Sequence, residues 1–302
     1  MMFGKTKEKN ILTQRDAAEK VIFGIMFAVF SIQILTILIP LGFMLMNSFK
    51  GRMEFNVTDL WTPPKKWLFK NWKESFQYLV VGDSKATEVT FIGMVWNSLW
   101  QTCVRATILS LTPMLVGYVY ARYDFYGKKT VMAVHLFTMT LPLFGSGGAY
   151  MKFIHDVGLF DSPLYFVLTS WNGRSPSVFI YSAAFAGLSH AYKEAAELDG
   201  ASRLRIFFAI EARMTAPIFW TFFINNTFGL WNDYTNILLY QPSYSNLATG
   251  LYLFGSRFEK SGNMHTPIYW CGLIIGSIPP LVLFAFSSDL IFKNMALGGL
   301  KG

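Results

Sequence analysis

Long apolar segments alternate with polar segments along this chain, and six of the apolar segments are predicted to cross a membrane. Val21–Met46 contains no charged residue, and as an α-helix it would extend about 39 Å, more than the hydrocarbon thickness of about 30 Å. A second segment runs from about Phe91 to Ala121, with a kink predicted at Pro113, and another runs from about Ile268 to Phe292. Each segment is predicted to be a transmembrane helix.

Three further spans lie between the second and the last of these segments. The third begins after Lys129 and is broken at Gly145–Gly148, and the fourth, near Leu164 to Leu188, is interrupted at residues 172–176. The fifth runs from about Met214 to Tyr240. The pattern therefore predicts an all-α integral membrane protein. Six transmembrane helices occupy residues 21–292, between an N-terminal segment, 1–20, and a C-terminal tail, 293–302.

The longest polar stretch, Lys50–Glu88, separates the first two spans. It contains Trp61, Trp67 and Trp72, and tryptophan is enriched where a membrane meets water. We expect a folded extramembrane loop with interfacial aromatic side chains. A second polar stretch, from about Gln241 to Thr266, carries three glycines and is also predicted to be an external loop.

Basic residues in the short loops predict the orientation. The loops between spans two and three and between spans four and five hold seven basic residues, against three in the opposite short loops. Loops rich in lysine and arginine remain in the cytoplasm, so both termini are predicted to be cytoplasmic and the loop 50–88 extracellular. The seven residues are Arg122, Lys128, Lys129, Lys193, Arg203, Arg205 and Arg213.

Composition agrees with a membrane location. Only 15% of residues are charged, against about 25% in soluble proteins, and 53% are hydrophobic. The net charge of +8 lies mostly in loops, as expected for contact with anionic lipid rather than nucleic acid. Cys103 and Cys271 lie inside apolar runs and are predicted to be buried thiols rather than a disulfide. The four histidines are scattered, so we expect no metal site and no catalytic site.

One cytoplasmic loop, residues 190–213, has a distinctive pattern. Ala191–Leu198 consists of strong helix formers, with Lys193 and Glu197 four residues apart. Gly200 suits the left-handed position just after a helix, and Ser202 could cap a second helix. The loop is therefore predicted to form two short helices at an angle.

The sequence of this loop resembles the EAA motif of permease subunits in ATP-binding-cassette (ABC) importers of type I. The matching residues are Glu194, Ala195, Ala196 and Gly200, with Asp199 before the glycine and Ile210 at the expected distance. Ala212 and Arg213 depart from the usual Leu-Pro. The resemblance implies a coupling helix that docks in a cleft on an ATPase subunit, with Glu194 contacting a basic residue. An amphipathic helix packed on its own chain is the alternative.

Weaker signals are similar to the carbohydrate-uptake branch of these permeases: Trp231-Asn232-Asp233, the Ser146-Gly147-Gly148 segment and the ending Leu297–Gly302. This resemblance implies import of a sugar or oligosaccharide across the bacterial cytoplasmic membrane. It implies as partners a second, different permease, two ATPase subunits and an extracellular sugar-binding protein. ATP and Mg would bind the ATPase subunits, so this chain is expected to be no enzyme and to hold no cofactor. The tail would insert between the ATPase subunits.

Charged side chains inside the membrane require a partner or water, because burying one in hydrocarbon costs at least about 2.5 kcal/mol. Trp231, Asn232, Asp233 and Arg105 are candidates for the substrate path. The alternative is an ion pair between Arg105 and Asp233 that holds two helices together.

Three other functions stay open. An importer permease for a peptide or amino acid would share the coupling motif. An ion-driven secondary transporter would be expected to show inverted repeats, and none is evident. A membrane enzyme would need a catalytic set, and no such motif is recognisable.

Overall fold

The computed structural model describes residues 17–59, 61–82, 88–141, 147–171, 173–261 and 265–298. The chain forms two compact units. The first comprises the described residues within Met1–Lys73 together with His265–Ile274, and the second comprises those within Glu74–Met264 and Ile275–Gly302. In these described ranges the regular structure is helical, apart from a single bridge between Val81 and Val89.

The first unit contains α2 (Ala17–Ser48), α3 (Arg52–Val57), the start of α4 (Lys70–Tyr78) and the first turns of α16 (Thr266–Gly298). Aromatic rings gather where α2 ends, with Phe49 against Trp67 and Trp72 at ring-centroid distances of 5.1 and 5.7 Å. Trp61 packs on Phe43 in the same unit. The predicted folded loop after the first span is therefore present, with its tryptophans in contact.

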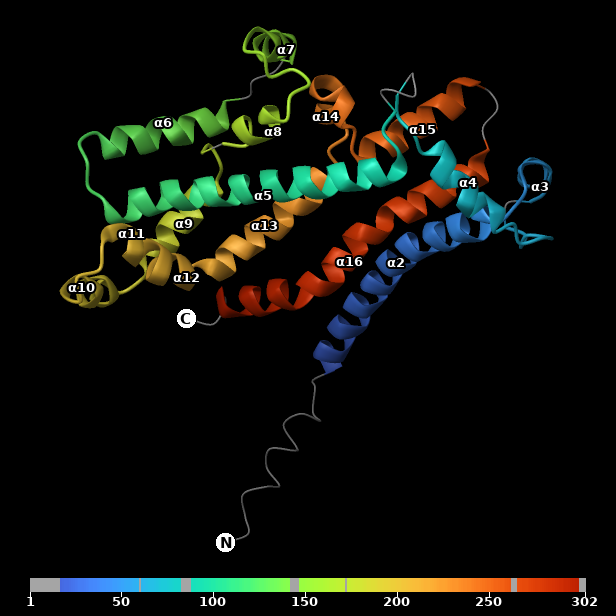
Figure 1. Ribbon diagram of the computed structural model, residues 1–302. Coiled ribbons are helices and arrows are strands. Elements are labelled where there is room, and N and C mark those ends of the chain that lie inside the picture. Colours follow the sequence, from blue (N-terminus) through green and yellow to red (C-terminus); the bar gives the residue numbers. More distant parts are fainter. Residues whose placement is uncertain are drawn as a thin grey trace. The chain divides into compact units, whose positions relative to one another are not determined.

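The second unit is built on the long helix α5 (Phe91–Arg122) (Figure 1). Its N-terminus is capped by Thr90, whose side chain accepts a hydrogen bond from the Gly93 amide. The remaining helices are α6 (Lys128–Thr140), α7 (Gly147–Asp156), α8 (Leu164–Leu168), α9 (Ser177–Ala186), α10 (His190–Leu198), α11 (Arg203–Ile206), α12 (Ala212–Met214), α13 (Ala216–Trp231), α14 (Thr235–Tyr240) and α15 (Leu247–Ser261). The second unit also contains a π-helix, η1 (Phe207–Glu211), a 3₁₀ turn, η2 (Pro242–Tyr244), the end of α4 and the part of α16 that begins at Ile275.

The core of this unit lies where α9 and α13 pack along α5. Met114, Tyr181, Phe185 and Phe207 form one buried cluster there. Gly117 permits the close approach of α9, because a Cβ atom at this position would lie 2.7 Å from both the Tyr181 Cβ and the Val178 carbonyl oxygen. Apolar burial and small residues together bring these helices into contact.

The prediction of six transmembrane helices is not confirmed. By length and hydropathy, three described helices could each cross a membrane: Glu19–Ser48, Phe91–Arg122 and Thr266–Phe286. Arg203–Met214 and Ala216–Trp231 would make a fourth span if the bent pair counts as one. The predicted third and fourth spans are each divided into short helices, α6 with α7 and α8 with α9. The predicted fifth span is interrupted after Trp231.

Other sequence-based boundaries need correction. The predicted external loop at 241–266 contains α15, because Leu247 and Phe254 are buried and Gly250 packs against Met94. The last helix does not end near Phe292 but continues to Gly298, so the predicted tail is partly helical. Both cysteines are free, but Cys103 is exposed rather than buried. The segment 1–16, residues 142–146 and 172, and the end 299–302 lie outside the described residues.

Candidate functional site

Helix α10 and the turn that follows it carry the predicted coupling residues. Ser189 caps the helix by accepting a hydrogen bond from the Ala191 amide. At the other end the Gly200 amide donates to the Glu197 carbonyl (3.0 Å) and the Ala201 amide donates to the Ala196 carbonyl (2.9 Å). This pair of bonds is a Schellman motif, and Gly200 has the left-handed φ of 73° that the motif requires. The predicted glycine stop is confirmed.

Most of the α10 surface faces outward. Glu194, Ala195, Asp199 and Gly200 are exposed, whereas Ala196 is buried against the rest of the unit. Lys193 and Glu197 form the expected pair one turn apart, with 3.8 Å between Nζ and Oε1. The helix therefore packs on its own chain through one face and offers an acidic side chain and small residues on the other.

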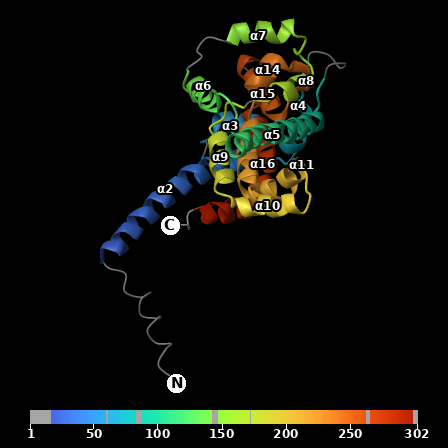
Figure 2. The same ribbon diagram turned by 90° about the vertical axis from the view of Figure 1, so that its left-hand side faces the viewer.

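The chain continues from this turn into a short helical rod of α11, η1 and α12. Ser202 caps the rod by accepting a hydrogen bond from the Arg205 amide, as the sequence predicts. Between Met214 and Ala216 the rod meets α13 at a bend of 72°. Figures 1 and 2 both show α10 beside the rod. Hence α10, the rod and α13 form one covalent path from the exposed turn into the core.

A buried ion pair joins this rod to the end of α5. The Arg122 Nε and Glu211 Oε1 atoms lie 2.6 Å apart, and both side chains are only 2% exposed. Arg122 also donates to the Leu188 carbonyl, at 3.5 Å, just before α10. Sequence reasoning counted Arg122 among loop charges and missed its role. The available signal was Glu211, an acidic residue inside an otherwise apolar stretch beginning at Ile206.

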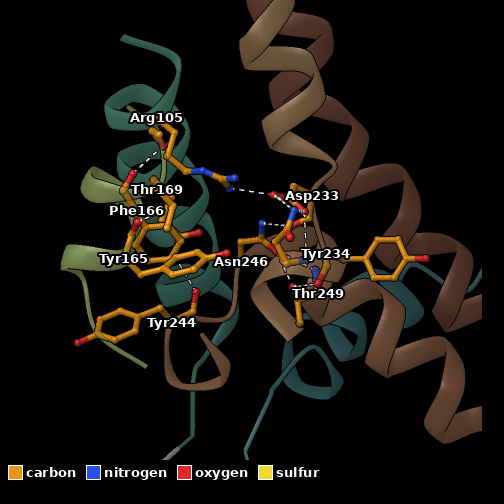
Figure 3. A network of polar contacts seen from close by, with 12 residues as sticks. Arg105, Tyr165, Phe166, Thr169, Asp233, Tyr234, Tyr244, Asn246 and Thr249 are labelled. Atoms are coloured by element: carbon orange, nitrogen blue, oxygen red, sulfur yellow. Dashed lines mark hydrogen bonds and ion pairs between the residues drawn. The ribbon is translucent and has the colours of Figure 1, made fainter. Parts of the chain in front are cut away.

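A second ion pair lies near the middle of α5 (Figure 3). Arg105 Nη1 lies 2.9 Å from Asp233 Oδ2, and each side chain is 12% exposed. The Arg105 guanidinium also lies over the Phe166 ring, 5.9 Å from its centroid. Asp233 accepts further hydrogen bonds from Asn236, and its carbonyl accepts one from Asn246. The ion pair that the sequence offered as an alternative is present, and it links α5 to the connection between α13 and α14.

Polar side chains one and two turns before Arg105 on α5 bind the backbone of two consecutive residues, Tyr244 and Ser245. Asn97 donates to the Ser245 carbonyl at 3.0 Å, and Gln101 donates to the Tyr244 carbonyl at 2.7 Å. Residues four apart lie on one face of a helix, so these two side chains and Arg105 form a polar stripe on α5. The stripe satisfies backbone groups that would otherwise be unpaired in an apolar interior.

The other predicted path residues are separated from this pair. The Trp231 side chain is 7% exposed and lines a cavity of about 110 Å³ with apolar neighbours that include Leu99 and Phe223. Asn232 is exposed, and its amide donates to the Phe228 carbonyl. Of the four candidates, the structure brings together Arg105 and Asp233 and leaves one open polar side chain, Asn232.

The fold matches solved structures of ABC importers. It superimposes with a TM-score of 0.69 on a chain of a bacterial ABC transporter involved in the import of the acidic polysaccharide alginate. The two chains share 18% identity over 92% of this chain and 99% of the other. The chain therefore shares the fold of this transporter chain.

Relatives of known sequence agree. The inner membrane ABC transporter permease protein YcjP of Escherichia coli (strain K12) is 26% identical, over 88% of this chain and 91% of its own. The melibiose/raffinose/stachyose import permease protein MelC of Bacillus subtilis (strain 168) is 24% identical, over 87% and 91%. A family profile, described as binding-protein-dependent transport system inner membrane component, matches residues 12–297. The chain belongs to this family of ABC transporter permease subunits.

Proposed function

We propose that this chain is the permease subunit of an importer that moves a sugar or oligosaccharide, delivered by an extracellular binding protein, through the membrane. Membership of the binding-protein-dependent family supports the transport class. The sugar class is supported by the similarity to the melibiose/raffinose/stachyose permease. The chain would work with a second permease and with two ATPase subunits that bind ATP and Mg.

The observation that carries the coupling role is the exposed, capped end of α10. Glu194 and Ala195 lie on its open face, and the Schellman turn at Gly200 fixes the direction in which the rod departs. An ATPase subunit that seats on this face would move α10, and the rod would transmit the movement to α13. Both termini and α10 would then lie on the cytoplasmic side.

Six crossings can be completed by the shorter helices. Helix α6, with 13 residues, is about 20 Å long and cannot cross the hydrocarbon alone. We assign the third crossing to α6 with α7 and the fourth to α8 with α9. The described residues between α8 and α9 that lack regular structure would need cover from protein, because lipid cannot satisfy free backbone groups.

Of the four candidate residues for the substrate path, we propose Asn232 as the one that contacts the sugar. The Arg105–Asp233 pair and the buried Trp231 have structural partners, which leaves Asn232 as the polar side chain open to a passing sugar. Asn232→Ala is expected to raise the KM for uptake, whereas Trp231 and Arg105 substitutions act first on stability.

Charge reversal at Glu194 tests the coupling role. The complete importer, reconstituted in proteoliposomes, is expected to lose ATP-driven uptake in the Glu194→Lys variant, while the amount of inserted permease stays unchanged. The matched control is Asp156→Lys, an exposed charge reversal on α7. Uptake at the unmodified rate by the Glu194→Lys importer would count decisively against the docking role.

Uptake measured with one solute at a time tests the sugar assignment independently of the coupling role. Raffinose-type oligosaccharides, maltodextrins and short peptides would be offered in turn to the reconstituted importer with its binding protein. Uptake of peptides without uptake of any sugar would refute the sugar assignment and leave the permease assignment intact.

A further inference from the structure

A polar cavity of about 180 Å³ lies at the end of α5, beside α10 and α11. Charged side chains provide much of its lining, with Arg122, Lys193 and Arg203 against a single carboxylate, Asp124. Two tyrosine side chains also line this cavity. They are Tyr118 and Tyr123. The lining therefore favours an anionic group.

An apolar groove begins where the polar cavity ends. Its first part, about 480 Å³, is lined by aliphatic and aromatic side chains and shares Tyr118, Tyr123 and Arg203 with the polar cavity. Its second part, about 280 Å³, extends the groove past Phe208 to Trp220, and its lining is apolar except for Arg213. Leu204 and Phe208 are 72% and 59% exposed, so large apolar surfaces are left open along the groove.

The cavities are ordered along α5. Leu111 lines the far part of the groove, Leu115 and Val119 line the near part, and Arg122 lines the polar cavity. From Leu111 to Tyr123 the helix rises about 18 Å. Helix α5 is long and apolar enough to cross a membrane and ends at Arg122. In a membrane that α5 crosses, the polar cavity at its end would lie nearer the surface than the groove.

Most charges around the polar cavity have partners. Arg122 pairs with Glu211, Lys193 lies 3.8 Å from Glu197, and Asp124 pairs with Lys128. In the part of the chain that the structure describes, Arg203 makes no ion pair and its side chain is exposed. This guanidinium lines both the polar cavity and the groove. It is the group placed to bind an anion that carries an apolar tail.

We propose that the polar cavity and the groove together bind one anionic phospholipid from the adjoining membrane leaflet. Arg203 binds its phosphate with Lys193 alongside, and an acyl chain lies in the groove against Leu115, Val119 and Phe208. A free anion would leave the apolar groove empty. An apolar helix of another protein would leave the basic side chains of the polar cavity without an anionic partner. The inference does not depend on which solute the importer carries.

Photo-crosslinking in the complete importer tests the proposal. The probe is phosphatidylglycerol with a photoreactive group in one acyl chain, added to proteoliposomes of phosphatidylcholine. Crosslinked peptides are expected from residues 111–119 and 204–208. Arg203→Gln is expected to weaken capture about tenfold, equivalent to about 1.4 kcal/mol, because it removes the cation that binds the phosphate. Val119→Trp is expected to abolish capture in the near part of the groove by filling it.

Arg205→Gln is the matched control, because Arg205 is an exposed arginine on the same helix and lines none of the three cavities. Its capture should stay within twofold of the unmodified importer. Equal losses in the Arg205 and Arg203 variants would overturn the site and leave a general charge effect. If inorganic phosphate competes as well as phosphatidylglycerol does, the proposal that the site binds a lipid is refuted. Crosslinks from residue 208 to another protein subunit would likewise overturn it.

Discussion

Arg122 and Glu211 are oppositely charged side chains held away from water, and their value depends on both being present. Removing one partner of a buried pair leaves an uncompensated charge and costs about 3–5 kcal/mol. Arg122→Met or Glu211→Leu alone is therefore expected to lower stability by this amount. The double substitution should recover most of the loss. Thermal unfolding in detergent gives the values.

The exposed pair of Lys128 and Asp124 is the control for that experiment, since Asp124 is fully solvent-accessible. Lys128→Met should cost less than about 1 kcal/mol. If the two pairs respond alike to single substitutions, the buried pair does not stabilise the junction between α5 and the rod.

Gly200 has open space around it, and its backbone conformation is what restricts substitution. Gly200→Val is expected to cost about 1–2 kcal/mol at the turn, because a left-handed φ is unfavourable for a side chain. The redirected rod should reduce ATP hydrolysis stimulated by the binding protein. Gly200→Asn should retain it, because asparagine tolerates this conformation. Similar losses in both variants would show that side-chain bulk, and not φ, matters here.

Local chemistry made several of these residues predictable. The helix stop at Gly200, the cap at Ser202 and the pair of Lys193 with Glu197 depend on neighbours within a few positions, and all three are present. Arg105 and Asp233 were also paired in advance, because each charge in an apolar run needs a partner. Glu211 was missed, since nothing near it in sequence shows that Arg122, 89 positions earlier, faces it.

At the scale of elements, the contact between α5 and α9 depends on glycine at position 117, where any side chain would collide with α9. Gly117→Ala is expected to destabilise the fold by about 1–3 kcal/mol, because the added Cβ would overlap Tyr181 and the backbone of Val178. Gly229→Ala on α13 meets nothing within 4 Å and should stabilise by up to about 1 kcal/mol through helix propensity. Melting temperatures that fall equally in both variants would contradict this packing.

Element boundaries were predicted best where one segment is long and uniformly apolar. Helix α5 agrees with the predicted second span within a residue or two, and continues through Pro113. The stretch that forms α15 was predicted to be a loop because it is polar and carries glycines, whereas Gly250 packs closely on Met94. Helices α8 and α9 pack on α5 through tertiary contacts that hydropathy does not record.

At the scale of the whole molecule, the number of crossings can be tested by labelling. Both native cysteines would be replaced, since Cys103 is exposed and would react. A cysteine at Tyr126, between α5 and α6, is expected to react only with a reagent on the cytoplasmic side of the membrane. One at Met53 in α3 should react only from outside. Both positions are strongly exposed. Reaction of both from one side would refute the proposed topology.

The rod and α13 meet at a bend of 72°, so they would act as the two arms of a lever that pivots at their junction. The rod from Arg203 to Met214 has 12 residues and is a rigid arm about 18 Å long. A tilt of about 10° at its pivot would sweep its far end through roughly 3 Å, on the order of half a helical pitch. The direction of the stroke would also change at the bend, so a push along the membrane plane would become a displacement along α13. The Arg122–Glu211 ion pair joins the rod to α5. Its stiffness would then determine how much of the rod's displacement reaches α13.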